Sequence, residues 1–392
     1  MAITDKKTGV WGLDQTYNKI NQGSIWDYSG IGELWMWGRN IYGNLGQNNE
    51  TNYSSPKQVP GSTWSALPRA VGGSMIYASM AVKTDGTLWT WGQNEHGQLG
   101  QNSTTKYSSP VQVPGTTWSQ DPTQISKGAC MQVIKTDGTL WSWGYNIQGQ
   151  DGSNTASNYK SSPVQVGSDT NWSKLGQART TPLAIKTDGT LWSWGGNQFG
   201  TQGQNDRTNR SSPIQIPGST WNDVAGGLNT VIATKTDGTL WMWGDQSESG
   251  GILGQNNTTQ YSSPVQVGSD TTWNTGDLKI ATNKRASAAI KTDGTLWAWG
   301  ANGYGNLGQN EGTQRSSPVQ IPGTDWNKIS NFEESGFYAI KTNGELWVWG
   351  RGSYGALAQG NETTYSSPRQ VPGTDWLQVT GEGYYGYAIK QF

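Results

Sequence analysis

One ten-residue block recurs seven times along this chain of 392 residues. Its commonest form is Lys-Thr-Asp-Gly-Thr-Leu-Trp-x-Trp-Gly, and successive copies are 49 to 56 residues apart with a mean of 52. The first tryptophans of the copies are Trp35, Trp89, Trp141, Trp192, Trp241, Trp297 and Trp347. Repeats of about this length are typical of solenoids and propellers, in which each unit buries its apolar face only against its neighbours. The block therefore predicts one tandem-repeat domain, where length alone would suggest two or three domains.

Tryptophan is almost confined to repeat positions. Of the 23 tryptophans, 14 belong to the seven blocks and a further seven open the repeat units. The unit-opening residues are Trp64, Trp118, Trp172, Trp221, Trp273, Trp326 and Trp376. Only Trp11 and Trp26 fall outside this scheme, so one domain is expected from about residue 17 to residue 392. Residues 1–16 have no counterpart in the repeat and are expected to form an N-terminal arm.

The local sequence of a unit predicts β-strands. Short alternating runs such as Ala-Ile-Lys and Leu-Trp-x-Trp flank Asp-Gly in five units and Asn-Gly in a sixth, which is typical of a hairpin with a type I′ turn. A second pair of strands, around Val-Gln-Val and after the opening tryptophan, would complete a four-stranded blade, because an isolated hairpin is only marginally stable. No segment has a sustained apolar stripe with helical spacing. The expected fold is an all-β, seven-bladed propeller.

The two ends of the chain predict how the ring closes. The first block, at residues 28–35, lacks the usual lead-in strand, whereas residues 387–390 are a lead-in strand with no block behind it. We therefore expect the C-terminal strand to pair with the strand at residues 33–37. The first blade would then be built from both ends of the chain, which leaves no unpaired strand edge there.

Composition limits the chemistry that the chain can support. Charged residues make up 14% of the chain, and 27 basic residues nearly balance 28 acidic ones, so neither nucleic acid nor an anionic membrane is an expected partner. The single histidine, His96, and the single cysteine, Cys130, exclude a histidine–cysteine zinc site and an intrachain disulfide. The sequence shows neither a signal peptide nor a membrane-spanning apolar run. We expect no metal, no cofactor and no catalytic residues.

The units resemble the RCC1 repeat, named after the regulator of chromosome condensation, in its bacterial and phage form. The resemblance is carried by residues 85–92 (Asp-Gly-Thr-Leu-Trp-Thr-Trp-Gly), by Asn94, and by Gly-Gln-Leu-Gly at 97–100, with equivalents near residues 141, 192 and 297. It implies a seven-bladed propeller closed by strand exchange between the termini. Eukaryotic relatives are guanine-nucleotide exchange factors that bind chromatin, and bacterial relatives include secreted inhibitors that bind β-lactamases with one face of the ring. No unit here has a large insertion resembling the exchange wedge.

One candidate binding surface is a ring of residues in the loop that follows each block. Because equivalent propeller loops emerge on one face, these side chains should form a partial aromatic collar there. They are Tyr42, His96, Gln148, Phe199, Tyr304 and Tyr354. Aromatic rings flanked by Asn and Gln suit stacking on a sugar or contact with a protein partner. The alternative is that each ring only caps its own blade.

A second candidate ring precedes the recurrent Ser-Ser-Pro and alternates tyrosine with cations. Its members are Tyr53, Tyr107, Lys160, Arg210, Tyr261, Arg315 and Tyr365. Tyrosine and arginine are enriched in binding hot spots. The alternative is a set of solvated residues beside a fixed turn.

Two further features distinguish the units. The segment before Lys291 is longer than its counterparts, and Lys279, Lys284 and Arg285 within it form a candidate specificity loop. A lysine also stands at one position of every unit, from Lys83 to Lys390. These lysines would either bind an anion or be neutralised by the aspartate of the adjacent turn.

Together these observations predict a non-enzymatic binding or structural propeller. Low charge, many Asn, Gln, Ser, Thr, Gly and Trp residues and near-regular repeats resemble a phage virion or tail-associated component. We expect a loop face to bind a partner protein or a surface glycan, with Trp11 and Leu13 attaching the ring to a larger assembly at a virion or an extracellular surface. The alternatives are a secreted or intracellular inhibitor or exchange-factor-like regulator, and a glycan-active enzyme with a carboxylate pair in the central cleft.

Overall fold

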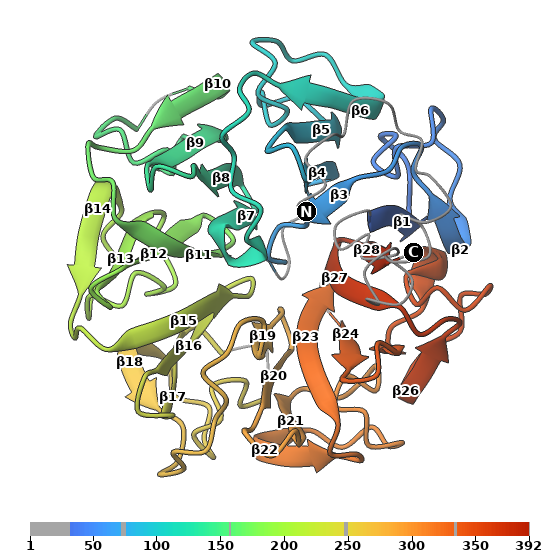
Figure 1. Ribbon diagram of the computed structural model, residues 1–392. Coiled ribbons are helices and arrows are strands. Elements are labelled where there is room, and N and C mark those ends of the chain that lie inside the picture. Colours follow the sequence, from blue (N-terminus) through green and yellow to red (C-terminus); the bar gives the residue numbers. More distant parts are fainter. Residues whose placement is uncertain (1–31, 72–75, 157, 247–249, 333–334, 392) are drawn as a thin grey trace, which may run out of the picture.

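Repetition of the sequence block is matched by repetition of structure. The computed structural model describes residues 32–391 apart from 72–75, 157, 247–249 and 333–334. Its strands form seven four-stranded sheets, arranged as blades around a central axis (Figure 1). Helical structure in these residues is limited to two short 3₁₀ turns, η1 (Pro122–Gln124) and η2 (Ser353–Gly355), so this part of the chain has no helix that could span a membrane. The predicted all-β propeller is confirmed.

Six blades are each formed by four consecutive antiparallel strands. Blade 1 contains β3 (Trp64–Ala66), β4 (Ala78–Lys83), β5 (Leu88–Gly92) and β6 (Tyr107–Val113). Blade 2 contains β7 (Ile125–Lys127), β8 (Cys130–Ile134), β9 (Leu140–Gly144) and β10 (Lys160–Gln165). Blade 3 contains β11 (Trp172–Ala178), β12 (Thr181–Lys186), β13 (Leu191–Gly195) and β14 (Arg210–Ile216).

The next three blades repeat this order. Blade 4 contains β15 (Trp221–Gly226), β16 (Thr230–Lys235), β17 (Leu240–Gly244) and β18 (Tyr261–Gln266). Blade 5 contains β19 (Ile280–Thr282), β20 (Ala286–Ile290), β21 (Leu296–Gly300) and β22 (Arg315–Ile321). Blade 6 contains β23 (Trp326–Phe332), β24 (Gly336–Lys341), β25 (Leu346–Gly350) and β26 (Tyr365–Val371).

Blade 7 closes the ring with strands from both ends of the chain. Its strands, from the axis to the rim, are β27 (Trp376–Glu382), β28 (Tyr385–Gln391), β1 (Gly32–Gly38) and β2 (Tyr53–Gln58). β1 is antiparallel to β28, with Trp35 opposite Ala388 and Glu33 opposite Lys390. The predicted pairing of the C-terminal strand with residues 33–37 is confirmed, and each end of the chain contributes half of this blade.

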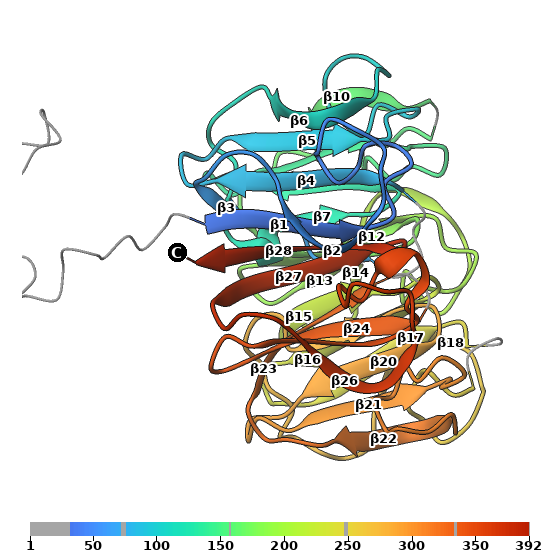
Figure 2. The ribbon, with the colours of Figure 1, turned by 90° about the vertical axis from the view of Figure 1, so that its right-hand side faces the viewer.

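The propeller has two faces with different connections. In every blade the first strand lies nearest the axis and the fourth lies at the rim (Figure 1). The face that carries the Asp-Gly turns and the unit-opening tryptophans is called the turn face; β1 begins and β28 ends there (Figure 2). The opposite face carries the loops between the third and fourth strands and the turns between the first and second strands. We call it the loop face.

The hairpins of the turn face differ in type from the prediction. The Gly86 N–H donates to the Lys83 carbonyl and the Lys83 N–H donates to the Thr87 carbonyl, which defines a three-residue loop. Of its residues only Gly86 has a positive φ, +75°, whereas a type I′ turn requires two. The Asp85 carboxylate accepts hydrogen bonds from both the N–H and the hydroxyl of Thr87. The predicted hairpins are present, but the predicted type I′ turn was wrong.

The second tryptophan of each block fastens its blade to the preceding one. All seven side chains are fully buried, and each indole N–H donates to a loop carbonyl of the neighbouring blade. The donor and acceptor pairs are Trp37 with Ala356, Trp91 with Asn44, Trp143 with Gln98, Trp194 with Gln150, Trp243 with Thr201, Trp299 with Ile252, and Trp349 with Asn306. Because a buried indole needs an acceptor for its N–H, this contact fixes the packing of neighbouring blades.

A glycine and a serine meet at the same junctions. Gly97 of blade 1 has a φ of +74°, and a Cβ there would lie 2.5 Å from the Cα of Ser161 in blade 2. The backbone N–H of Asn102 donates to the Ser161 carbonyl beside it. Both contacts recur at the other six junctions, with Gly360 in place of the asparagine in blade 6. The Asn-x-x-Gly loops and Ser-Ser-Pro segments therefore build the junctions between blades.

Candidate functional site

The loop face carries all the residues of the predicted aromatic collar. Tyr42, His96, Gln148, Phe199, Tyr304 and Tyr354 each lie in a loop between a third and a fourth strand. Tyr354 differs from the others in its backbone, because its φ is +58°. This left-handed conformation is uncommon for a residue other than glycine and is often found at functional sites. The Tyr354 side chain is 37% exposed.

Arg39 joins three tyrosines of the loop face into one cluster. Its guanidinium lies 4.6 Å from the ring centre of Tyr354 and 5.4 Å from that of Tyr77. Its Nη1 also donates to the Tyr77 hydroxyl at 2.9 Å. The ring of Tyr42 lies 5.5 Å from that of Tyr77. The cluster therefore links the loop of blade 7 with residues of blades 6 and 1.

Arg351 extends this cluster towards blade 5. Its guanidinium lies 5.0 Å from the ring centre of Tyr304 and 5.4 Å from that of Tyr384, and the Arg285 guanidinium lies 5.5 Å from Tyr304. Tyr384 in turn contacts Tyr354, with ring centres 5.1 Å apart. We call this continuous surface over blades 5, 6, 7 and 1 the Arg–Tyr belt. Its members are Arg39, Tyr42, Tyr77, Arg285, Tyr304, Arg351, Tyr354 and Tyr384.

The belt presents positive charge together with aromatic surface. Arg39 and Arg351 form no ion pair within the described part of the chain; Arg351 donates from Nε to the Ser353 hydroxyl at 3.1 Å. Arginine held between tyrosine rings keeps its guanidinium fork ordered, and such a fork suits a carboxylate. This arrangement suits contact with a carboxylate-bearing protein surface.

Four members of the belt were predicted from the sequence: Tyr42, Tyr304 and Tyr354 in the collar, and Arg285 in the specificity loop. The other four were not predicted as site residues. Arg39 and Arg351 directly follow the Trp-Gly of their blocks, where the other units have Gln, Tyr, Gly, Asp or Ala. Tyr77 and Tyr384 stand just before a second strand. A comparison of the units position by position would have found these departures. It would not have shown that they adjoin, because blades 6, 7 and 1 become neighbours only when the ring closes.

The collar is interrupted on the other half of the loop face. His96 packs with Tyr159 and Tyr145, with ring centres 4.2 Å and 5.4 Å away. No ring contact of Phe199 is present among the described residues, and its side chain is half-buried. The predicted ring of equivalent side chains is therefore divided into the Arg–Tyr belt, a separate His96 cluster, and the isolated Phe199.

Exposed apolar side chains also concentrate on the loop face. Five large hydrophobic residues of the described chain are exposed: Ile41, Ile147, Tyr159, Tyr354 and Leu377. The first four lie in loops between third and fourth strands. Leu377 alone lies near the turn face, as the second residue of β27. The two faces thus differ in the surface that they offer to a partner.

Five of the seven residues of the second predicted ring are bonded within their own loops. Tyr53, Tyr261 and Tyr365 each accept a hydrogen bond from the side chain of an asparagine four residues earlier. Arg210 and Arg315 instead form ion pairs with an acidic residue four positions earlier, Asp206 and Glu311. Tyr107 and Lys160 occupy the same strand position. In these five residues, tyrosine pairs with asparagine and arginine pairs with an acidic residue.

The structure separates the residues of the candidate specificity loop. Lys279 precedes β19 on the turn-face side, and its Nζ donates to the Asn327 side chain at 2.7 Å. Burial lowers the pKa of this lysine. Lys284 and Arg285 follow β19 on the loop face. One contiguous segment thus supplies residues to both faces, and only Arg285 joins the belt.

The repeated lysines cover tryptophan rings. Each ammonium lies 4.7 to 5.8 Å from the ring centre of the unit-opening tryptophan, as for Lys291 at 5.1 Å from Trp273. Three also form ion pairs: Lys186 with Asp169, Lys291 with Asp270, and Lys341 with Asp325. No described turn aspartate forms such a pair. The pKa of each of the five is lowered mainly by hydrogen bonds from threonine and also by the charge of the lysine two residues before it. The Lys291 ammonium lowers the pKa of Asp270 to about 2.

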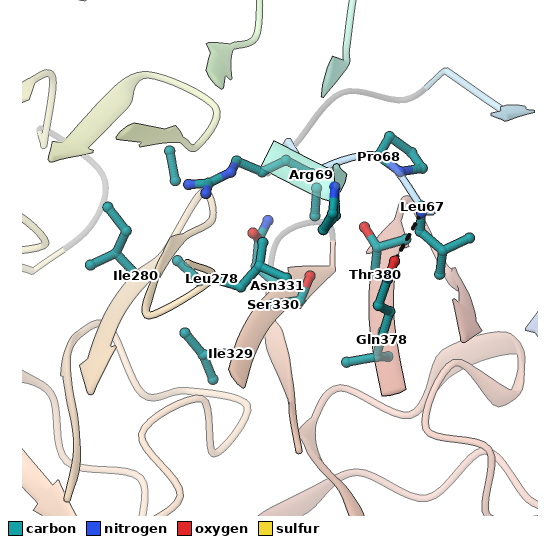
Figure 3. Close-up of a pocket in the computed structure, with 15 residues that line it drawn as sticks. Leu67, Pro68, Arg69, Leu278, Ile280, Ile329, Ser330, Asn331, Gln378 and Thr380 are labelled. Carbon is teal, nitrogen blue, oxygen red and sulfur yellow. Dashed lines mark hydrogen bonds between the residues drawn. The ribbon is translucent and has the colours of Figure 1, made fainter. Parts of the chain in front are cut away.

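The axis of the propeller is closed by buried ion pairs. Arg69 of blade 1 lies 2.7 Å from Asp223 of blade 4, and Lys127 of blade 2 pairs with Glu382 of blade 7. All four side chains are at least 95% buried. Figure 3 shows Arg69 beside a small axial pocket, where Gln378 accepts a hydrogen bond from the backbone N–H of Leu67.

The axial region holds two buried carboxylates, Asp223 and Glu382, and each is paired with a cation from another blade. The described residues contain no group of His, Cys, Asp and Glu that could hold a metal ion. Cys130 is buried, as expected of a small apolar side chain. Trp11 and Leu13 lie outside the described residues.

Repeat, blade structure and ring closure together define a seven-bladed β-propeller. The family model described as the regulator of chromosome condensation (RCC1) repeat matches residues 32–73, 85–129, 188–233, 293–333 and 343–385. A second model of the same description matches residues 278–306. The matches cover more than half of the chain, and the chain belongs to the RCC1-repeat family.

Solved structures of low sequence identity share this fold. Human WBSCR16 superposes with a TM-score of 0.77 at 20% identity, covering 92% of this chain and 100% of that one. Prp20p from Saccharomyces cerevisiae, whose structure was described with its binding to Gsp1p and histones, superposes with a TM-score of 0.76 at 18% identity and 92% coverage of both chains.

Relatives found by sequence are longer than this chain. The ultraviolet-B receptor UVR8 of Arabidopsis thaliana is 24% identical over 302 residues, which is 75% of this chain and 66% of the receptor. The human E3 ubiquitin-protein ligase HERC2 is 25% identical over 189 residues, 48% of this chain and 4% of the ligase. The chain thus spans just under two thirds of the first relative and a small part of the second.

Proposed function

We propose that this propeller is a non-enzymatic module that binds a partner protein with its loop face. The observation that carries the proposal is that four of the five exposed large hydrophobic residues in the described chain lie on the loop face, which also holds the Arg–Tyr belt. Exposed apolar surface beside tyrosine and arginine is the usual composition of a protein-binding hot spot.

The relatives support a role exercised through partners. Prp20p was solved in a study of its binding to Gsp1p and histones, and the same yeast protein was also solved bound to Kap60. UVR8 is a receptor, and HERC2 is a ligase in which this chain matches only 4% of the length. A protein-binding regulator is the function that these proteins and the loop face favour together.

The finer predictions from the sequence stay predictions. A role in a virion or at an extracellular surface, attachment through Trp11 and Leu13, and a surface glycan bound at the collar each need their own test. A density map of the ring in its native assembly would test the first two, since an anchored ring would leave residues 1–31 at the contact.

The loop-face proposal is tested with a pair of matched variants. The double variant Ile41→Asp, Tyr354→Asn introduces charge and removes a ring from the loop face, and asparagine tolerates the left-handed backbone of Tyr354. Leu377→Asp is the control, because it places the same charge on the exposed apolar residue near the turn face. Each protein is used as bait in a lysate of its native source, with cross-linking and mass spectrometry to locate the contact.

We expect the wild type and Leu377→Asp to recover the same partner, cross-linked to the loop face, and the double variant to recover about tenfold less, as loss of hot-spot contacts predicts. Equal recovery by all three proteins, or cross-links confined to the turn face, would overturn the proposal. Thermal unfolding of the three proteins shows whether each remains folded.

A further inference from the structure

A groove between blades 4 and 5 shares no residue with the Arg–Tyr belt. It has a volume of about 390 Å³, within the range of roughly 300–1,000 Å³ found for small-molecule sites. Blade 4 supplies its loop residues, and blade 5 supplies two tryptophans and a lysine. The lining residues that matter for its chemistry are Gln255, Asn256, Asp270, Trp273, Lys291 and Trp297.

The groove combines aromatic surface with uncommitted hydrogen-bonding atoms. Trp297 is only partly buried, and it forms one wall. Gln255 donates from Nε2 to the carbonyls of Leu253 and Gln266, while its Oε1 receives no hydrogen bond from the described residues. Asn256 is exposed, and its Nδ2 donates to none of them. A free acceptor and a free donor beside an indole match a sugar ring, whose hydroxyls both donate and accept.

The charges of the groove neutralise each other. The Lys291 ammonium lies 2.5 Å from the Asp270 carboxylate and 4.3 Å from the Trp297 ring centre. Because the ammonium is already held by the carboxylate and by the indoles, the groove offers little net charge to an ion. Its chemistry therefore favours a neutral ligand over a phosphate or a uronic acid.

A similar groove lies between blades 1 and 2. It has a volume of about 340 Å³ and is lined at the equivalent positions by Gln101, Asn102, Trp118, Lys135 and Trp141. The segment before its unit-opening tryptophan is one residue shorter, and Gly115 stands three residues before that tryptophan, where the first groove has Asp270. The chain thus contains a second copy that lacks the carboxylate, and two sites on one rigid ring would strengthen binding to a polymer.

We propose that the groove between blades 4 and 5 binds a segment of a neutral oligosaccharide, with a pyranose ring stacked on Trp297 and hydroxyls bonded to Gln255, Asn256 and Asp270. The groove between blades 1 and 2 is a weaker site of the same kind. Neither groove shares a residue with the Arg–Tyr belt or with the exposed hydrophobic residues of the loop face, so this glycan site is separate from the protein-binding function proposed above.

The test follows individual tryptophans by fluorine NMR of the full chain labelled with 5-fluorotryptophan. The resonances of Trp297, Trp141 and Trp37 are assigned from Trp→Phe variants, and cellohexaose, maltohexaose and chitohexaose are the probes. We expect at least one probe to shift the Trp297 resonance first and that of Trp141 at higher concentration. Trp37, buried at the junction of blades 6 and 7, should not move.

Two variants copy residues that the chain already uses at equivalent positions. Gln255→Ser with Asn256→Gly reproduces Ser153 and Gly360, which occupy the corresponding places at two other junctions. We expect this double variant to abolish the Trp297 shift and to leave that of Trp141 unchanged. Asp270→Gly reproduces Gly115 and should weaken the Trp297 response to the level of Trp141.

The proposal fails if no probe shifts Trp297 at concentrations up to about 10 mM, well above a dissociation constant of ~1 mM. It also fails if the Trp297 shift persists in the Gln255→Ser, Asn256→Gly variant. A variant that unfolds would collapse all tryptophan resonances together, in which case Asp270→Gly decides alone. The loop-face variant Ile41→Asp, Tyr354→Asn should keep the sugar response, so failure of one proposal is distinguishable from failure of the other.

Discussion

The glycines at the blade junctions and those in the turn-face loops have the same backbone conformation but different surroundings. Gly97 and Gly268 have φ values of +74° and +61°. A Cβ on Gly97 would lie 2.5 Å from the Cα of Ser161, whereas a Cβ on Gly268 would have no heavy atom within 4 Å. Both positions favour glycine for its backbone freedom, but only the first also requires the absence of a side chain.

This difference gives a matched pair of substitutions. Gly268→Ala should lower the free energy of unfolding by about 1–2 kcal/mol, the cost of a left-handed alanine. Gly97→Ala should lower it by about 3 kcal/mol or more, because overpacking against a neighbouring backbone adds about 1–3 kcal/mol. Urea unfolding followed by tryptophan fluorescence measures both. Equal losses of unfolding free energy in the two variants would show that the blade junction can accommodate a methyl group.

The hairpins of the turn face are held by one side-chain arrangement that repeats. In five blades the turn aspartate accepts two hydrogen bonds from a threonine, and that threonine accepts one from the first tryptophan of the block, as Thr87 does from Trp89. These hydrogen bonds to Thr are the main cause of the lowered pKa of each aspartate. In blade 6 Asn343 accepts the backbone bond in the same place. The hairpin turn therefore forms with either aspartate or asparagine, but only aspartate makes its stability depend on pH.

The direction of that sensitivity follows from linkage. A carboxyl group whose pKa is lower in the folded state stabilises the fold above the pKa of the unfolded chain, about 3.9, and the contribution is lost as the pH falls through the folded value. We expect a variant with all five turn aspartates replaced by asparagine to lose less of its urea resistance between about pH 6 and about pH 3 than the wild type does. The replaced residues are Asp85, Asp137, Asp188, Asp237 and Asp293. If the variant and the wild type lose the same urea resistance between the two pH values, the acid sensitivity comes from other groups, of which Asp270 is the first to examine.

At the scale of the whole molecule, the centre of the ring is held by charges from distant blades. β3 ends at Ala66, and the segment behind it carries Arg69 towards blade 4, where its guanidinium contacts both Asp223 and the Val224 carbonyl. Lys127 lies against the Ala78 carbonyl and the Tyr385 hydroxyl, and burial lowers its pKa. These contacts tie non-adjacent blades together across the axis, in addition to the junctions between neighbours.

The axial pair between Arg69 and Asp223 can be removed in two ways with different results. Arg69→Met leaves a buried carboxylate without a partner and should lower the free energy of unfolding by about 3–5 kcal/mol. Adding Asp223→Leu removes the unpaired charge and should restore most of that loss, because two apolar side chains can replace a buried pair. Urea unfolding of both variants and of Asp223→Leu alone completes a double-mutant cycle, which measures the interaction energy of the pair. Additive losses would mean that the pair does not act as a unit.

Much of the fold was predictable from single units, because the repeat is enforced locally and at every junction. The hairpins, the number of blades and the pairing of residues 33–37 with the C-terminal strand all follow from residues that recur at fixed spacing. The turn type did not follow, because the Asp-Gly dipeptide is compatible with two loops and the hydrogen bonds from Thr87 to Asp85 favour the three-residue one.

The architecture of this protein follows from its repeated sequence pattern, whereas the location of its binding surfaces depends on how the blades are arranged in space. Residues that recur in every unit are those that form the blades, so they predict the blades but do not indicate a binding site. The Arg–Tyr belt depends on residues that depart from the repeat, such as Arg39, which contacts Tyr354 although most of the chain separates the two. They meet because closing the ring places blade 7 beside blade 6. Such contacts depend on the positions of whole blades, and no local sequence pattern specifies them.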